Sequence, residues 1–113
     1  MDNLLIVTDT TQNVSIMNVK GRVDSNTAPE LDSALENLLK NEKNKIVLNL
    51  KAVDYLSSAG LRALVKALKD AQQSGGDLRL AAVSEQTEVV LRTVGMMQMF
   101  KMFPTNEEAL AGF

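Results

Sequence analysis

Hydrophobic and polar residues alternate in the first part of the chain with the period of β-strands. The apolar run at residues 4–7 predicts a short strand, and a polar turn follows at 9–13. A second alternating segment starts at Val14, and its phase slips at Met17. This slip is typical of a β-bulge. We therefore predict a second strand that pairs back on the first and ends at Gly21.

The next segment changes to the period of an amphipathic helix. Thr27 and Glu30 form a T-x-x-E capping box around Pro29, so the helix is expected to begin here. Its predicted inner face consists of five residues at helical spacing: Leu31, Ala34, Leu35, Leu38 and Leu39.

A short apolar run at residues 46–50 predicts a strand that is covered on both faces. A second amphipathic helix should start near Ser57 or Ser58 and stop before Gly75. Its predicted inner stripe is Leu61, Leu64, Val65, Leu68 and Ala71, whereas Arg62, Lys66, Lys69 and Asp70 face outward.

The C-terminal third predicts a strand, a helix, a short strand and a brief last helix. The strands are expected at 78–83 and 100–103. Ser84 is the predicted N-cap of the third helix, and a second T-x-x-E box starts the last one at Thr105. The third helix should bury Val90, Leu91 and Val94 and stop at Gly95.

The predicted order of elements is therefore ββαβαβα, then a short strand and a terminal helix. Alternation of strands and helices after an opening hairpin predicts an α/β fold in which amphipathic helices pack on a mixed β-sheet. No repeat, low-complexity tract or linker interrupts the pattern, so residues 1–113 are expected to form a single domain.

Composition excludes several classes of function. The 113 residues include no cysteine and no histidine, which excludes thiol nucleophiles, Ser-His triads and the common zinc-ligand sets. The net charge is −2 and basic residues are interspersed with acidic ones, so no nucleic-acid partner is expected. The start of the chain is acidic and no stretch approaches membrane-spanning length, which favours a cytoplasmic protein without a membrane partner.

Motifs that would indicate an enzyme are also missing. The chain has neither a GxxxxGK[ST] loop nor a GxGxxG turn after a strand. A receiver-type phospho-acceptor aspartate would stand where Asn49 does, and a Ser58–Lys66 dyad would need a lysine from the outward helix face. We therefore expect no enzymatic activity, no bound cofactor and no metal site.

Residues 54–61 form the most informative stretch, because they join a buried strand to an amphipathic helix. This junction should lie at the carboxyl end of the sheet, where open α/β sheets place their functional surface. A phosphoryl group on Ser57 or Ser58 would face free backbone N–H groups and the positive end of the helix dipole. The alternative is structural, since serine is a favoured N-cap and contributes about 1 kcal/mol in that role.

Three further features have both a functional and a structural interpretation. Asp24, in the loop before the first helix, either lies beside Ser58 at the same edge or only favours the helix start. Asn49 interrupts an apolar strand and is expected to tie it to a neighbouring loop. Four methionines between Met96 and Met102, together with Phe100 and Phe103, either fill the core or form an adaptable binding surface.

Taken together, these motifs resemble those of the STAS domain of bacterial anti-sigma factor antagonists. The similarity rests on Val-Leu-Asn-Leu at 47–50, Tyr-Leu-Ser-Ser-Ala-Gly-Leu at 55–61 and Gly-x-Val-Asp at 21–24. It extends through the glycine turns at 75–76 and 95 to residues 107–110, so it covers nearly the whole chain.

The resemblance implies a regulatory cycle. In this family, an anti-sigma factor that is also a serine kinase phosphorylates the antagonist, and a PP2C-type phosphatase reverses the modification. Only the unphosphorylated form binds the anti-sigma factor and releases the sigma factor. Alignment on Gly60 makes Ser58 the implied phosphorylation site, with Ser57 as second choice, and matches Asp24 to the family's loop aspartate. The expected partner-binding residues are Asp24, Ser57, Ser58, Gly60 and Arg62.

Two positions depart from the family pattern, and they leave other functions open. Ala59 stands in place of a second hydroxyl residue. Ser57 stands where the best-known members have an aspartate, immediately before the target serine. The alternative is a STAS adaptor subunit of a signalling scaffold or transporter complex that is never phosphorylated, in which both serines are caps. A small-ligand sensor or enzyme is a third alternative, for which no catalytic set is visible.

Overall fold

A five-stranded sheet with four helices forms the body of the protein, in a computed structural model that describes residues 4–113. The acidic first residues, 1–3, lie outside the described part. The strands are β1 (Leu5–Thr11), β2 (Val14–Val23), β3 (Lys45–Leu56), β4 (Asp77–Ala81) and β5 (Lys101–Phe103). The helices are α1 (Ala28–Lys40), α2 (Ser58–Gln73), α3 (Glu85–Thr93) and α4 (Asn106–Leu110). This order of elements confirms the predicted α/β fold.

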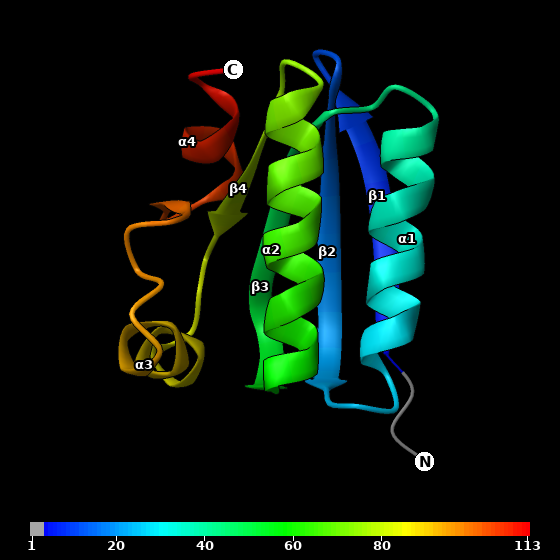
Figure 1. Cartoon of the computed structure of the whole chain (residues 1–113). Coiled ribbons are helices and arrows are strands. Elements are labelled where there is room, and N and C mark those ends of the chain that lie inside the picture. Colours follow the sequence, from blue (N-terminus) through cyan, green and yellow to red (C-terminus); the bar gives the residue numbers. More distant parts are fainter. Residues whose placement is uncertain (1–3) are drawn as a thin grey trace.

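The strands follow the chain order across the sheet, β1-β2-β3-β4-β5, as Figure 1 shows for β1 to β4. β1 and β2 form an antiparallel hairpin, and every later neighbour pairs in parallel, so the sheet is mixed as expected. The predicted slip in β2 is confirmed as two register shifts against β3, between Asn18 and Lys20 and between Gly21 and Arg22. The prediction that Gly21 ends β2 is wrong. Its positive φ of 120° accommodates an irregularity, and the strand continues to Val23.

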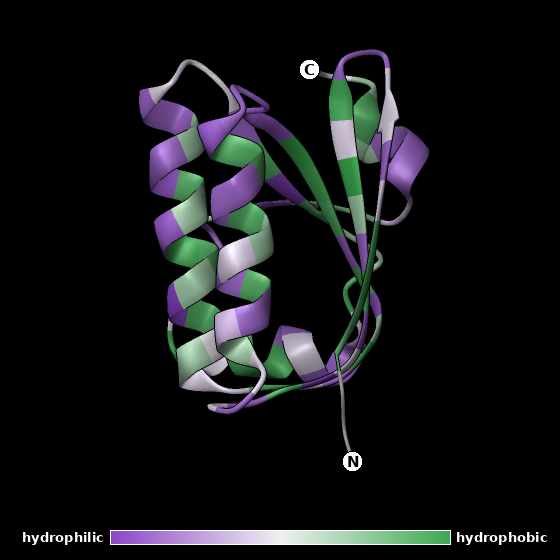
Figure 2. Ribbon diagram, turned by 90° about the vertical axis from the view of Figure 1, so that its right-hand side faces the viewer, coloured by the Kyte–Doolittle hydropathy of each residue, from purple (hydrophilic) through white to green (hydrophobic). Residues whose placement is uncertain are grey.

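The helices cover the two faces of the sheet unequally. Figure 2 shows α1 and α2 side by side on one face and α4 on the other. On the second face, α4 covers a small apolar cluster formed by Val14, Val47, Ala81 and Ala109. The remainder of that face, over β1 and the carboxyl halves of β2 and β3, carries exposed residues such as Leu5 and Val7.

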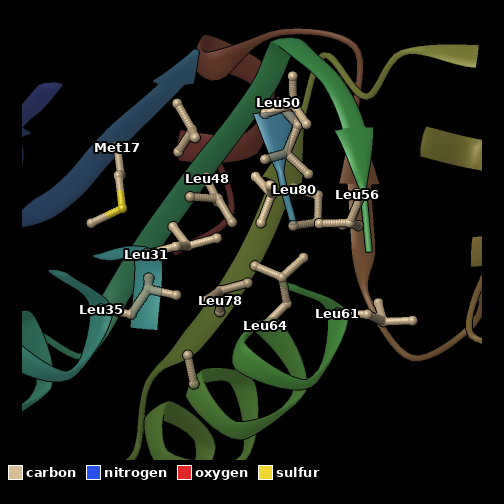
Figure 3. Close-up of a cluster of buried hydrophobic side chains, with 14 of the residues drawn as sticks. Met17, Leu31, Leu35, Leu48, Leu50, Leu56, Leu61, Leu64, Leu78 and Leu80 are labelled. Carbon is tan, nitrogen blue, oxygen red and sulfur yellow. The ribbon is translucent and has the colours of Figure 1, made fainter. Parts of the chain in front are cut away.

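The main core lies between the sheet and the helix pair α1–α2. Figure 3 shows the leucines of β3 and β4 meeting those of both helices, with Leu56 and Leu61 at one end of the cluster. Leu31, Leu48, Leu64 and other members are completely buried. Because strand residues alternate between faces, this cluster contains residues from one face of the strands, and α4 covers part of the other face.

Most predicted helices are confirmed, but one predicted cap and one predicted buried residue differ in the structure. α1 begins at Ala28, yet the Thr27 hydroxyl does not cap it, so the predicted capping box is wrong. That hydroxyl donates instead to the Arg22 carbonyl oxygen at 2.6 Å. In α3, Leu91 is buried as expected, but Val94 is 49% exposed because the helix ends at Thr93.

A buried arginine fastens the C-terminal segment to the sheet. The Arg79 guanidinium donates to the carbonyl oxygens of Ala109 and Gly112, both at 2.9 Å, and pairs with the Asp77 carboxylate at 3.5 Å. It also lies 3.9 Å from the centre of the Phe113 ring. The carbonyl groups at the end of α4 are thus satisfied by a side chain from β4, which positions this short helix.

Candidate functional site

The carboxyl ends of β2 and β3 meet the first turns of α1 and α2 at one edge of the protein, the lower edge in Figure 1. The Ser57 N–H donates to the Val23 carbonyl oxygen at 2.8 Å, which joins the end of β2 to the start of α2. Parallel strands bring their carboxyl ends to the same side of a sheet, so this edge collects the loops that follow both strands.

Ser57 and Ser58 have different positions in the first turn of α2. Ser57 is the N-cap, and its Oγ accepts from the Gly60 N–H at 3.2 Å. Ser58 is the first helical residue and its side chain is exposed. Within the described residues, its hydroxyl makes no hydrogen bond to protein. The structural interpretation therefore applies to Ser57, which leaves Ser58 available to solvent.

Gly60 allows α2 to approach the sheet closely. A Cβ atom on this glycine would lie 2.5 Å from Cγ1 of Val23 and 2.8 Å from Cδ1 of Leu56. Both distances are shorter than real contacts, so a larger residue would push the first turn of α2 away from the strand ends. Gly60 is buried in the turn that carries Ser58.

Among the four helices of the described chain, α2 alone has no acidic residue in its first turn. α1 carries Glu30 there, while α3 and α4 carry two glutamates each. Acidic side chains near a helix N-terminus compensate the positive end of the helix dipole. The start of α2 lacks that compensation, so a negative charge added there would be favoured locally.

Asp24 organises the loop between β2 and α1. Its Oδ1 accepts from the N–H groups of Asn26 at 2.9 Å and Thr27 at 3.0 Å, and its Oδ2 lies 3.4 Å from Nε of Arg22. These contacts, first the hydrogen bond from the Thr27 N–H, lower the pKa of the Asp24 carboxyl below its ordinary value. Asp24 is therefore an anion that holds the loop next to Val23 and Ser57.

Arg22 and Tyr55 extend this edge and were not singled out from the sequence. The two residues are register partners at the ends of β2 and β3. The Arg22 guanidinium lies 4.0 Å from the centre of the Tyr55 ring, a cation–π contact, and Tyr55 is 41% exposed. The sequence shows both side chains and indicates an irregularity in β2, but it does not show which residue of β3 lies beside Arg22 after the two register shifts.

A shallow groove of about 280 Å³ separates the starts of α1 and α2. Arg62, exposed one turn after Ser58, contributes to it. Lys66 lies further along and pairs with Asp32 at 3.8 Å and Glu36 at 3.7 Å, so it belongs to a helix–helix ion-pair group and not to a dyad with Ser58. The lining residues are Ser25, Ala28, Pro29, Asp32, Ala59, Arg62, Ala63 and Lys66.

The structure brings the expected site residues to this one edge. Asp24, Ser57, Ser58 and Gly60 lie on adjoining loops and the first turn of α2, and Arg62 follows one turn later. Across residues 4–113, no group of three or more acidic side chains is arranged to hold a metal ion. No helix in the same range combines the length and apolar character needed to cross a membrane.

Comparison with known proteins shows which family this chain matches. The family model of the STAS domain matches residues 6–109. The chain belongs to the STAS domain family. It is 30% identical to the anti-sigma-B factor antagonist of Staphylococcus aureus over 97 residues, which cover 86% of this chain and 90% of that protein. It is 25% identical to the anti-sigma-F factor antagonist RsfB of Mycobacterium tuberculosis over 111 residues, or 98% and 90% of the two chains.

Solved structures show the same fold. The crystal structure of an anti-sigma factor antagonist from Mycobacterium paratuberculosis superposes with a TM-score of 0.86 at 26% identity, covering 96% of this STAS chain and 92% of the other. SpoIIAA in its unphosphorylated form gives a TM-score of 0.81 at 15% identity, covering 94% and 93%. The Bacillus cell fate determinant SpoIIAA in its phosphorylated form gives 0.75 at 16% identity, covering 95% and 97%.

Proposed function

We propose that this STAS domain is an anti-sigma factor antagonist regulated by phosphorylation of Ser58. In its unphosphorylated form it binds an anti-sigma factor that is also a serine kinase, and the sigma factor is released. Phosphorylation of Ser58 prevents this binding, and a PP2C-type phosphatase restores it. The chain acts by binding in the cytoplasm, and the ATP of the cycle is bound by the kinase.

The observation that carries the proposal is the position of Ser58. It is exposed on the first turn of the helix that lacks acidic residues there, next to a serine that already performs the capping. A phosphate at this position faces the positive end of the helix dipole and so leaves the fold intact. The phosphate therefore changes the binding of a partner at this edge of the protein, and not the fold.

The switch works through charge at an interface. A phosphoserine carries about −1.5 to −2 charges at neutral pH. If the partner surface offers no cation, burying that charge is strongly unfavourable, and the complex dissociates. In the free protein Arg62 is the nearest cation along the helix, four residues from Ser58, a spacing at which side chains meet on one face. We expect the Arg62 guanidinium to form an ion pair with the phosphate on Ser58 when no partner is bound.

The relatives support the class of partner. Proteins 25–30% identical to this chain over most of its length are anti-sigma factor antagonists. The two SpoIIAA structures have the same fold with and without phosphate, which supports a modification that changes binding and not folding. The replacement of the family aspartate by Ser57 removes one negative charge beside the phosphate and retains an N-cap.

Calorimetry with the cognate anti-sigma kinase tests this proposal. The unmodified protein and Ser58→Ala are expected to bind, and only Ser58→Ala should keep its affinity after incubation with kinase and ATP. Phosphopeptide mapping of the wild type should then find a single site, Ser58. Phosphate on Ser57 would retain the mechanism and reject the assigned residue. An anti-sigma kinase that neither binds nor phosphorylates the protein would favour the adaptor alternative.

A further inference from the structure

The two edges of the sheet differ in their protection against pairing with another strand. β5 has only three residues, carries the exposed Lys101 and is followed by Pro104, all of which discourage further pairing. The opposite edge, β1, has seven residues, with no proline, no lysine and no break in its register with β2. Its only charge is Asp9. β1 thus lacks the usual protection of an edge strand.

β1 is also exposed along its length, and part of that exposed surface is apolar. Leu5 is 56% and Val7 is 50% exposed, on the sheet face opposite α1 and α2. Figure 2 looks at the β1 edge of the sheet, and α1 and α2 lie on one face of the sheet, so they do not cover this edge. A shallow depression of about 340 Å³ on this face is lined by Leu5, Val7, Asn18, Lys20, Lys51 and Ala52, among others.

Hydrogen-bond alternation shows which backbone groups of β1 point outward. The hairpin turns through two residues, Gln12 and Asn13, both with positive φ, so Thr11 and Val14 form the hydrogen-bonded pair that closes it. Alternate residues of an antiparallel strand bond to the same neighbour. The odd-numbered residues of β1 therefore bond to β2. The even-numbered ones, which include Ile6 and Thr8, direct their N–H and C=O groups away from the sheet.

We propose that β1 pairs antiparallel with β1 of a second copy of this chain, about a two-fold axis at Val7. In this register, Ile6 and Thr8 of one copy bond to Thr8 and Ile6 of the other, which satisfies the outward groups. Val7 meets Val7 of the second copy across a closely spaced pair, and Leu5 lies opposite Asp9 of the second copy. The result is one continuous sheet through both copies.

Charge complementarity supports this register. Lys20 is the register partner of Leu5 on β2, so it lies two strand spacings, roughly 10 Å, from Asp9 of the second copy on the same face. An extended lysine side chain spans most of this distance, and the two-fold axis forms the pair twice. The edge therefore fits its own copy in hydrogen bonding and charge. A single pair of short strands buries little area, so we expect a reversible, concentration-dependent dimer.

Cysteine cross-linking tests the register directly, because the native chain has no cysteine. Val7→Cys places two sulfurs across a closely spaced antiparallel pair, within the Cα separation that a disulfide needs. It should form a covalent dimer much faster than Val89→Cys, a control on α3 that replaces a valine of similar exposure, 52%. Thr8→Cys should also cross-link slowly, because the residue opposite it is Ile6. Equal rates for Val7→Cys and Val89→Cys would overturn the proposal.

Sedimentation velocity of the wild type and charge variants provides a second test. The wild type should self-associate with rising concentration, and Val7→Lys should abolish this while Val89→Lys does not. Asp9→Lys and Lys20→Asp should each weaken the dimer roughly three- to tenfold, and the double variant should recover it. A wild type that stays monomeric at every concentration, or a double variant weaker than both single ones, would contradict the assignment. None of these residues belongs to the Ser58 edge, so failure here leaves the proposed phosphorylation switch unaffected.

Discussion

The first turns of α2 and α3 have the same serine cap but differ in charge, since that of α2 is neutral and that of α3 is acidic. Ser57 and Ser84 each accept a hydrogen bond from the backbone N–H three residues ahead, at 3.2 and 3.3 Å. The next residue is Ser58 in α2 and Glu85 in α3, both exposed. α3 also has Glu88 in its first turn, whereas α2 has no acidic residue there.

This comparison separates capping from regulation. A serine cap is common to both helices, so capping by itself marks no functional site. At α3 the helix dipole is already compensated by carboxylates of the chain. At α2 the same position holds a neutral hydroxyl, on a turn that fits against the strand ends through Gly60. The difference indicates that the N-terminus of α2, and not that of α3, is suited to a reversible modification that adds negative charge.

Exchange of the two first-turn residues should give the largest effect. Ser58→Glu gives α2 the charge pattern of α3 and should weaken binding to the anti-sigma partner roughly tenfold or more, because an unmatched interfacial charge costs several kcal/mol. The matched change Glu85→Ser should leave affinity within about twofold of the wild type. Calorimetry of both variants measures the difference, and equal affinities would remove the distinction between the two turns.

Loss of the close packing at α2 should be the next largest effect. Gly60→Ala is expected to destabilise the protein by about 1–3 kcal/mol, because its Cβ would overlap Val23 and Leu56. In a Val23→Ala background, which removes the nearest contact atom, the same substitution should be less destabilising. Urea unfolding of the wild type, Gly60→Ala, Val23→Ala and the double variant gives the coupling free energy between the two positions. Strictly additive effects would show that the fit between Gly60 and Val23 does not hold the turn.

The order of elements could be predicted from the sequence because periodicity is a local signal. The leucines of α1 and α2 recur at helical spacing, and residues 46–50 are apolar except for Asn49, as is typical of a strand buried on both faces. Asn49 also behaves as expected. Its amide donates to Oδ1 of Asn106 at 2.9 Å and so ties β3 to the start of α4.

What the sequence could not show depends on contacts distant along the chain. Thr27 has the pattern of a capping residue, but the Arg22 carbonyl, brought near by the turn at Asp24, takes its hydroxyl. Arg79 looks like a surface residue of a strand, yet carbonyl groups 30 and 33 positions later hold it in the interior. The serine edge was predictable because a strand–helix junction is local, whereas the contact of Arg22 with Tyr55 depends on register.

Removal of the two caps should have equal, moderate effects on stability. Ser57→Ala and Ser84→Ala are each expected to cost about 1 kcal/mol of unfolding free energy, since each hydroxyl satisfies one backbone donor. Ser58→Ala should change stability by less than about 0.5 kcal/mol, because its hydroxyl is exposed. Urea denaturation of the three variants measures these differences in unfolding free energy. A large loss for Ser58→Ala would mean that this serine is structural.

The smallest expected effect concerns pH. Hydrogen bonds from the loop lower the pKa of Asp24 below its ordinary value of 3.8. A carboxyl with a lowered folded-state pKa stabilises the protein above its unfolded-state pKa, and this contribution is lost as pH falls through both values. Asp24→Asn retains an acceptor for the loop but no charge, so its stability should fall less steeply below about pH 4 than that of the wild type. Parallel pH curves in thermal unfolding would argue against this role.

The site of modification in the source cells tests the central claim most directly. Intact-mass measurement of the isolated native protein, followed by phosphopeptide mapping, should find one phosphoryl group, on Ser58, in a fraction that changes with growth or stress conditions. A chain that stays unmodified under all conditions, even when phosphatases are inhibited, would contradict a switch at α2.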